Sequence, residues 1–164
     1  MTVRIPAGIA DGQRLRIYGE GEHGTQGGPT GDLYVIVHVA AHAFFHREGD
    51  DLFAEVPVPF HVMALGGTFK LNGPGGPLDV HVPANSSNGA MVTFRSKGMP
   101  SVAGHGRGSL HVRLVVDVPK KLTKDQKKLI EQLGQSLPQS AIEPTPVDTE
   151  AERPFFDKVK DLFG

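Results

Sequence analysis

Residues 3–21 read VRIPAGIADGQRLRIYGEG, and residues 80–98 read VHVPANSSNGAMVTFRSKG. The two stretches align without a gap at an offset of 77 positions, and the alignment continues to residues 39 and 116. Ten of the 37 aligned pairs are identical, and the identities fall on turn residues and on alternating apolar residues. Glycines set the geometry of turns and alternating valines form a buried face, so the pattern predicts two copies of one β-unit.

Each copy is predicted to contain three strands joined by turns. In the first copy we expect strands at residues 3–5, 14–18 and 33–39, with a tight turn at residues 11–12 and a glycine-rich loop at 19–31. The second copy repeats this pattern with strands near residues 78–82, 92–94 and 110–118. Alternation in the third strand of each copy predicts one strongly buried face.

A further strand is predicted between the two copies. Residues 51–60 alternate between apolar and other residues, and Pro57 and Pro59 share the face opposite the apolar one. Proline has no amide hydrogen to donate to a neighbouring strand, which predicts an edge strand. Residues 61–65 are expected to form a short helical turn that ends at Gly66, and residues 69–77 begin a hairpin.

The periodicity changes after Pro119. A helix is predicted over residues 122–134, with Thr123 as its N-cap and Gly134 at its end. Its apolar stripe consists of Leu122, Leu129, Ile130 and Leu133.

The chain after this helix divides into a linker and a tail. Residues 135–153 have the composition of a flexible linker. Residues 154–164 predict an amphipathic helix, which is too short to be stable alone in water and is expected to dock on protein. Disorder and membrane association remain open for this tail. Its apolar face consists of Phe155, Phe156, Val159, Leu162 and Phe163.

Composition excludes several classes of function. With 17 Lys and Arg against 18 Asp and Glu, the chain lacks the basic excess of a nucleic-acid or membrane-surface binder. Cysteine is absent, which excludes disulfides and thiolate zinc sites within this chain and fits a reducing, cytoplasmic compartment. The longest apolar runs fall short of the roughly 18 residues that a membrane-spanning helix needs. We expect no cofactor and no metal.

Two short motifs carry weak chemical signals. Residues 19–24 match the spacing G-x-G-x-x-G, but no helix pattern follows to aim backbone amides at a phosphate, which favours a sharp loop between strands. Asp50 and Asp51 are adjacent, so in a strand they point to opposite faces and cannot flank one substrate bond. A turn that enters a strand explains them better.

Histidines recur every fourth position at His38, His42 and His46. This spacing resembles a helical metal pair, but the segment leaves a strand and neither cysteine nor a suitably spaced carboxylate completes a ligand set. His42 is expected to fix its loop as a hydrogen-bond donor. A small hydrolase that uses His42 and Asp51 is the remaining, less favoured reading.

Several segments closely resemble, in order, the C-terminal substrate-binding region of DnaJ-type co-chaperones. The resemblance covers about the whole chain and includes the tail at residues 155–161. Its ordered motifs lie at residues 3–21, 31–35, 42–52, 64–67, 98–100, 106–110 and 119–126.

The resemblance implies a mostly β fold with two tandem, related, sandwich-like β-domains, of which the first is incomplete, followed by a dimerisation helix. Residues 1–49 would be the latter part of substrate-binding domain I, residues 50–120 domain II, and residues 121–134 the dimerisation helix. Residues 135–153 would then be the linker and residues 154–164 the tail helix.

The implied function is that of a molecular co-chaperone fragment and not of an enzyme. The family binds unfolded polypeptide by apolar contact and delivers it to a DnaK-type ATPase chaperone, so the expected partners are unfolded clients, a second copy of the chain and, through the full-length protein, the ATPase. Val3, Val35 and Val37 are the implied client-binding residues, and Leu122, Leu129, Ile130 and Leu133 the dimer contacts. Nucleic acid and membrane are not expected partners.

The sequence also departs from the family pattern. It contains no J-domain with a His-Pro-Asp motif, no Gly/Phe-rich linker and no cysteine-rich zinc module, so stimulation of the ATPase is not carried over to it. Ala43 replaces the proline that usually follows the histidine of its loop. The alternative interpretation is a self-assembly module that pairs through exposed sheet edges and the aromatic tail, without client binding of its own.

Overall fold

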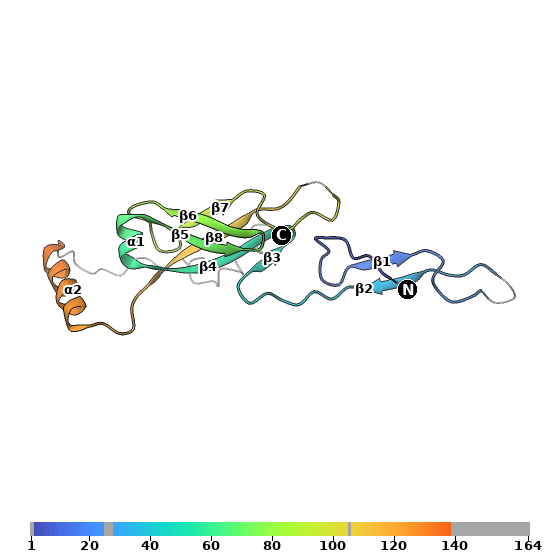
Figure 1. Cartoon of the computed structure of the whole chain (residues 1–164), viewed down its shortest axis with the longest axis horizontal. Coiled ribbons are helices and arrows are strands. Elements are labelled where there is room, and N and C mark those ends of the chain that lie inside the picture. The colour runs from blue at the N-terminus through green and yellow to red at the C-terminus, as the bar shows by residue number, and fades with distance from the viewer. Residues whose placement is uncertain (1, 25–27, 105, 139–164) are drawn as a thin grey trace, which may run out of the picture.

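The structure is a computed structural model that describes residues 2–24, 28–104 and 106–138. These residues form eight strands and two helices, which confirms a mostly β chain with a C-terminal helix. The molecule is elongated: a two-stranded hairpin lies at one end, a larger β-body occupies the middle, and the C-terminal helix lies at the other end (Figure 1). The predicted linker begins too early, because Gln135 and Ser136 belong to the C-terminal helix, and the rest of the linker from residue 139 and the whole tail lie outside the described residues.

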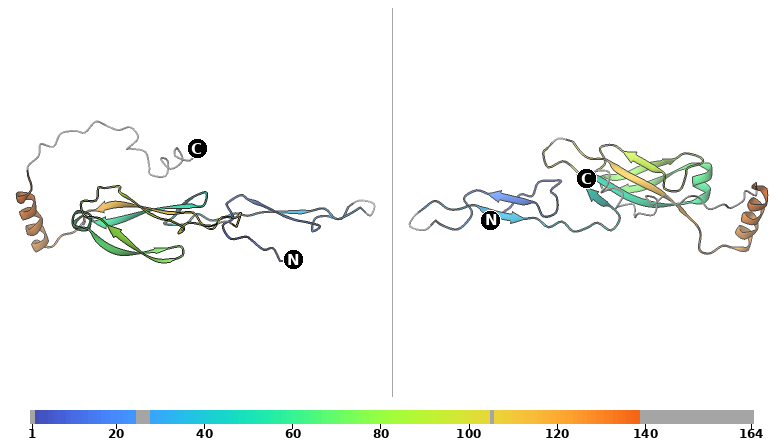
Figure 2. Two further views of the ribbon diagram at one scale, coloured as in Figure 1. Left: turned by 90° about the horizontal axis from the view of Figure 1, so that it is seen from above. Right: turned by 180° about the vertical axis from the view of Figure 1, so that it is seen from behind.

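The β-body has two layers. One layer is a four-stranded sheet in the order β3-β4-β8-β7, in which β4 and β8 are parallel and the other pairs are antiparallel. The other layer is the β5-β6 hairpin, which packs over this sheet (Figure 2). The elements are β3 (His46–Glu48), β4 (Asp51–Pro59), α1 (Phe60–Leu65), β5 (Gly67–Gly73), β6 (Gly76–Val82), β7 (Met91–Phe94) and β8 (Leu110–Asp117).

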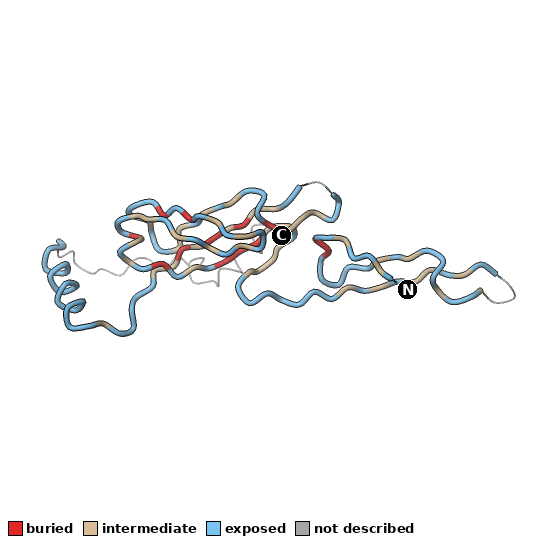
Figure 3. The backbone as a smooth tube through the Cα atoms, viewed as in Figure 1, coloured by how far each residue is buried: buried red, intermediate tan, exposed pale blue. Residues whose placement is uncertain are grey.

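The core lies between these layers. Val80 and Val82 of β6 are fully buried against the inner face of β8, whose apolar residues alternate with half-buried ones. Met63 of α1 and Leu52 and Val58 of β4 belong to the same buried cluster. Figure 3 shows most of the buried backbone within this β-body. Burial of one such side chain stabilises a fold by about 1.5–3 kcal/mol, so this body carries most of the apolar stabilisation of the described chain.

The repeat is reproduced in the strand register. In the first copy β1 (Arg14–Ile17) pairs with β2 (Leu33–Ile36), and Arg14 lies opposite Ile36. In the second copy Met91 lies opposite Arg113, and both residues stand 77 positions later. Two of the three strands of the predicted unit are thereby confirmed in both copies, whereas the sandwich-like character of both domains stays a prediction.

The turns repeat as well. The amide of Gly12 donates to the carbonyl oxygen of Val37 at 2.8 Å, and the amide of Gly89 donates to that of Leu114 at the same distance. Both glycines have positive φ, +74° and +85°, a region that side chains with a Cβ rarely adopt. Identical turn glycines thus mark identical backbone geometry in the two copies.

The predicted strand at residues 3–5 does not form. The equivalent Val80 and Val82 pair with Phe69 and Gly67 of β5, whereas no described strand pairs with residues 3–5. A strand needs a partner, and this segment has none among the described residues.

The prediction of an edge strand at residues 51–60 was wrong. β4 lies inside the sheet between β3 and β8. However, β3 reaches only as far as Phe53, so the later part of β4 has no strand on that side within the described chain. Leu52 donates its amide to Ser109 on the β8 side, and alternation turns the nitrogens of Pro57 and Pro59 toward the open side. The prolines therefore mark an open flank of an interior strand.

The C-terminal helix α2 (Lys124–Ser136) ends later than predicted. Gly134 lies within the helix, and the C-cap is Leu137, directly before Pro138. A residue that precedes proline is disfavoured in helical geometry, so the proline sets the end and the glycine does not. The predicted N-cap is confirmed by a capping box, in which Thr123 and Gln126 each accept the other's backbone amide hydrogen.

Candidate functional site

The first copy exposes a face that the second copy buries. Leu33, Val35 and Val37 are half-buried, whereas their equivalents Leu110, Val112 and Leu114 have no exposed surface. β6 and α1 cover this face in the second copy, and the described residues provide no such cover for the first. We call this surface the open apolar face, and it consists of Leu15, Ile17, Leu33, Val35 and Val37.

The three sequence-predicted client residues lie in two segments. Val35 and Val37 share one face of β2 and its continuation, at strand spacing. Val3 belongs to the segment before the first turn, which leaves the hairpin on the same side as the β5-β6 layer (Figure 2). Ile5 beside it is 57% exposed, whereas its equivalent Val82 is fully buried.

The opposite face of the hairpin holds apolar residues that the sequence interpretation did not include. Tyr18 is 74% exposed, Tyr34 is 58% exposed and Ile36 is 51% exposed. The guanidinium of Arg16 lies 4.5 Å from the ring centre of Tyr18 and 5.9 Å from that of Tyr34. The apolar residues Tyr34 and Ile36 were visible in the sequence, but one-sided burial was assumed for this strand.

Asp32 connects this cation–aromatic group to the loop after β1. Its carboxylate accepts hydrogen bonds from the backbone amide of Gly19, at 2.9 Å, and from Arg16. The Gly19 amide and the guanidinium both favour the charged carboxylate and hold the pKa of Asp32 below its usual range. The same hydrogen bond raises the pKa of Arg16.

The outer edge of β2 also differs from its equivalent. Val37 donates its amide to Gln13 at 2.9 Å, so its backbone faces β1, and alternation turns the backbone groups of Tyr34 and Ile36 outward. Their equivalents His111 and Arg113 pair with β4. The described residues place no strand on the β2 edge, which leaves backbone donors and acceptors beside the open apolar face.

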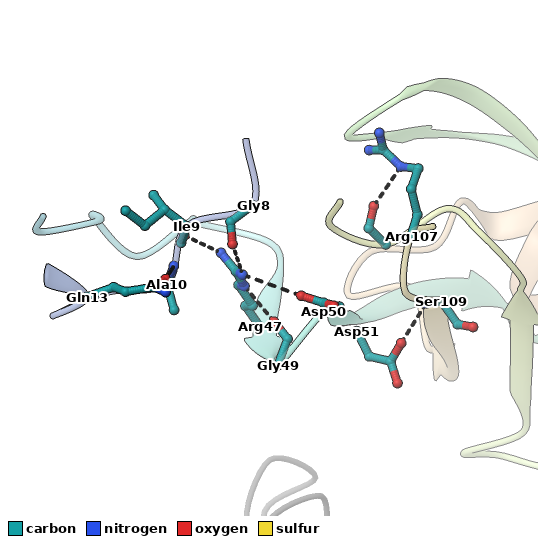
Figure 4. Close-up of polar contacts among 11 residues, drawn as sticks. Gly8, Ile9, Ala10, Gln13, Arg47, Gly49, Asp50, Asp51, Arg107 and Ser109 are labelled. Carbon is teal, nitrogen blue, oxygen red and sulfur yellow. Dashed lines mark hydrogen bonds and ion pairs between the residues drawn. The ribbon is translucent and has the colours of Figure 1, made fainter. Parts of the chain in front are cut away.

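Arg47 joins the two copies. Its guanidinium donates to the carbonyl oxygens of Gly8 at 2.5 Å, Ile9 at 2.8 Å and Gly49 at 2.7 Å (Figure 4). It also lies 3.8 Å from the carboxylate of Asp50. The side chain thereby ties the first turn of the first copy to the start of β4.

The loop at residues 98–108 completes this junction. Met99 donates its amide hydrogen to the carbonyl oxygen of Asp50 at 2.8 Å. Ser109 donates its amide hydrogen to the carboxylate of Asp51 at 2.6 Å, as Figure 4 shows. A Cβ on Gly8 would overlap the carbonyl oxygen of Pro100, so the two copies approach closely here. Asp51 is therefore a structural acceptor in this junction, which agrees with the interpretation of a turn that enters a strand.

The histidines take structural roles, and the role of His42 differs from the prediction. His42 accepts a hydrogen bond from the amide of Phe44 at 3.1 Å, so it fixes its loop as an acceptor and not as the predicted donor. His46 lies 2.6 Å from the carboxylate of Glu48. Within the ranges that the structure describes, no three His, Cys, Asp or Glu side chains gather as a possible metal site.

α2 presents an apolar stripe to solvent. Every residue of the helix is exposed in the single chain, with Leu129 at 64%, Ile130 at 39% and Leu133 at 44%. Leu137 extends the stripe by a further turn and is 56% exposed. Leu122 precedes the N-cap and is half-buried. The predicted dimer residues thus form one unpartnered face, apart from Leu122.

Most of the chain matches a known protein family. The family model described as the DnaJ C terminal domain matches residues 1–119. The chain belongs to the DnaJ C-terminal domain family. In this DnaJ C-terminal domain, the family-like segments at residues 42–52, 98–100 and 106–110 all meet at the Arg47 junction.

Curated relatives are bacterial DnaJ chaperones. The chaperone protein DnaJ of Geobacillus sp. (strain WCH70) is 43% identical over 161 residues, which cover 98% of this chain and 41% of the relative. That of Opitutus terrae is 40% identical over 163 residues, with 99% and 41% covered. That of Bacillus velezensis is 40% identical over 166 residues, with 99% and 42% covered. The chain spans about two fifths of the length of the relatives it matches.

The assignment places the chain in a chaperone region of DnaJ type, and all of these relatives are named as chaperones. The helices in the described ranges of this DnaJ C-terminal domain are all too short or too polar to cross a membrane.

Proposed function

We propose that the chain holds non-native polypeptide on the open apolar face of its first copy. We also propose that it pairs with a second, identical chain through α2. The observation that carries this function is the contrast in burial between equivalent residues. Val112 has no exposed surface while Val35 is half-buried, although the two strands share sequence pattern and register. Apolar contact scales with area and needs no fixed pattern of donors, which suits varied clients.

The β2 edge supports the same proposal. In the second copy β4 occupies the corresponding edge of β8 and buries Val58 and Leu52 beside the core. An extended client segment on β2 would gain backbone hydrogen bonds and place alternate side chains next to the open apolar face. We include Val3, from the segment before the first turn, with Val35 and Val37 in the proposed client surface.

Dimerisation through α2 rests on its unpartnered stripe. A helix of 13 residues whose residues are all exposed gains little from its own chain, and helices of this length are marginal alone in water. The stripe is buried when Leu129, Ile130 and Leu133 pair with the same residues of a second chain. The two chains of the dimer would then hold one client at two points, which raises the effective affinity without new contacts.

The wider role is proposed from the relatives. We propose that the longer protein delivers clients to a DnaK-type ATPase chaperone in the cytoplasm, with no enzymatic activity, cofactor, nucleic acid or membrane of its own in this region. The near balance of charge and the absence of cysteine support these expectations.

The test uses isosteric polar replacements. Val35→Thr with Val37→Thr keeps β-branched shape and removes apolar surface. We expect loss of about 1 kcal/mol for each half-exposed valine, hence roughly tenfold or more weaker affinity for a permanently unfolded client. Binding is measured by fluorescence anisotropy, together with suppression of client aggregation. Val118→Thr, at a valine that is 71% exposed outside the face, is the matched control and should bind as the parent does.

A second variant separates client binding from self-assembly. Ile36→Pro removes an outward amide without touching the β1-β2 ladder. Weaker client binding with unchanged mass supports strand addition by clients. Intact client binding in both the valine variant and the proline variant would refute the open apolar face. Loss of higher oligomers in Ile36→Pro, with client binding absent from the parent chain, would establish the self-assembly alternative.

A further inference from the structure

A cluster of positive charge lies at the start of α2 and in the segment before it. Five lysines fall within residues 120–128, and Asp125 is the only acid among them. All five are exposed, and the ion pairs between described residues involve none of them. We call this surface the lysine face, and it consists of Lys120, Lys121, Lys124, Lys127 and Lys128.

The lysines of the helix share one side of it. Lys124, Lys127 and Lys128 stand three and four positions apart, so they are neighbours on the helix surface. Leu133 of the apolar stripe follows Lys124 by nine positions, about two and a half turns, which places it on the opposite side. A partner on the lysine face therefore leaves the stripe free for a second chain.

The lysines stand at the end of α2 where a helix disfavours positive charge. Aligned backbone dipoles make the N-terminus of a helix partly positive, so cations stabilise the last turn and destabilise the first. α2 has the reverse arrangement, because Lys124 is its first residue and its last turn contains no basic residue. Helix stability does not explain the cluster, whereas an anionic partner is attracted by both the lysines and the helix N-terminus.

The chain contains a segment of opposite charge shortly after α2. Residues 143–152 read EPTPVDTEAE and carry four acidic residues and no basic one. Pro144 and Pro146 favour an extended chain, which spreads the carboxylates along a surface. The segment has little apolar surface besides Val147 and the prolines, so charge is its main means of contact.

The connection between α2 and this segment is long enough for the contact and short enough to favour it. α2 is about 20 Å long, and the six residues from Leu137 to Glu143 span up to about 20 Å when extended. Glu143 can therefore return to the first turn of α2, and the later acids can reach Lys120 and Lys121. A short tether gives an effective concentration of about millimolar, so ion pairs that are individually weak still form together.

We propose that the acidic segment 143–152 lies along the lysine face of α2 and is its resident anionic partner. The contact neutralises the charge that the helix start disfavours and leaves the apolar stripe to a second chain. An acidic peptide from another protein would have to displace this segment to use the same lysines. The contact depends neither on client binding by the first copy nor on pairing of α2.

Paramagnetic NMR on the full chain tests the contact. Because the chain has no cysteine, Thr149→Cys accepts a single nitroxide label inside the acidic segment. The tether alone keeps this label near the end of α2, so the reference is the same labelled chain with its four acids neutralised. The neutralised chain carries Glu143→Gln, Asp148→Asn, Glu150→Gln and Glu152→Gln.

The expected result is a salt-dependent loss of signal at the far end of α2. At about 50 mM salt the amide signals of Lys120 and Lys124 should be roughly twofold weaker in the parent than in the neutralised chain. At about 1 M salt, where the Debye length is about 3 Å, this difference should vanish. Val147→Thr with Ala151→Ser keeps all four acids and should behave as the parent does.

Variants of the helix provide the second arm of the test. Replacing Lys124, Lys127 and Lys128 by Gln should restore the signals of residues 120 and 124. Replacing Lys70, Arg95 and Lys97 by Gln removes the same charge from exposed positions elsewhere and should leave the signal loss unchanged.

The outcomes separate the possible occupants of the lysine face. Signal loss that appears when labelled chains are mixed with unlabelled, isotope-enriched ones supports the contact and assigns the segment to the second chain. Equal signals in the parent and the neutralised chain at low salt would overturn the proposal and leave the lysine face to a partner outside this chain. A difference that persists at about 1 M salt would also overturn it, because charge would not be its cause. Neither failure bears on client affinity, which the valine variants measure separately.

Discussion

A single side chain, that of Asp32, links the loop at residues 19–31 to the strands of the first copy. It binds the amide of Gly19 and the guanidinium of Arg16, and Arg16 in turn lies against Tyr18 and Tyr34. The equivalent residue of the second copy is Ser109, whose amide binds Asp51. The carboxylate thus comes from the end of the loop itself in the first copy and from β4 in the second copy.

This link predicts a dependence of stability on pH. Because the folded pKa of Asp32 is lowered, its contribution is fully present above the unfolded pKa, near 4, and is lost as pH falls through the folded value. Asp32→Asn should therefore unfold at lower urea concentration than the parent at pH 6, and the difference should shrink as pH falls below about 4 and vanish only below the folded pKa. Glu20→Gln, an exposed acid in the same loop, should show no such gap. A gap that is constant with pH would contradict the assigned role of the charge.

At the scale of elements, α2 combines a fixed start with two opposed faces. The Thr123 capping box fixes its first turn, the apolar stripe covers one side and the lysines cover the other. Such a helix is built for contact, since nothing of its own chain buries it in the described part of the molecule.

The stripe predicts the oligomeric state. Leu129→Asp with Leu133→Asp places two charges in the proposed dimer contact and should halve the mass measured by light scattering. Gln132→Asp with Gln135→Asp adds the same charges to the other side of the helix and should leave the mass unchanged. A double leucine variant that keeps the parent mass would refute the dimer assignment.

Local patterns predicted the elements well, and long-range pairing limited the rest. The repeat at residues 3–39 predicted both hairpins because turn glycines and alternating valines are local signals. The strand at residues 3–5 failed because strand formation depends on a partner elsewhere in the chain. Arg47 was missed because the carbonyls of Gly8 and Ile9 that it binds lie about forty positions earlier and carry no side-chain signal. The site residues on β2 followed from alternation, whereas the unequal burial of the two copies needed the structure.

At the scale of the whole molecule, the Arg47 junction sets how the first copy stands on the second. Polar contacts dominate this region, and Ile9 is the buried apolar residue of the first copy, at 7% exposure. Orientation therefore depends on a few hydrogen bonds more than on buried area, and the junction sets the direction of the open apolar face.

Arg47→Met tests this dependence. The variant keeps an unbranched apolar stem and removes the donors to three carbonyl oxygens, so we expect a loss of about 1–3 kcal/mol in the stability of the first copy. Residual dipolar couplings should show β1 and β2 reoriented relative to β4 and β8, with the β-body unchanged. Arg14→Met, on exposed β1, is the control. Unchanged couplings would show that the Gly8–Pro100 approach alone holds the two copies.

The parallel pairing of β4 with β8 has a consequence for how the chain is made. Leu52 pairs with Leu110, so the centre of the sheet closes a loop of 58 positions. At synthesis rates of about 5–20 residues per second, β4 leaves the ribosome several seconds before β8 exists. During that interval an apolar strand waits without its neighbour, and closing so long a loop adds an entropic cost to the folding barrier. A protein region of the chaperone class thus passes through the aggregation-prone stage of synthesis itself.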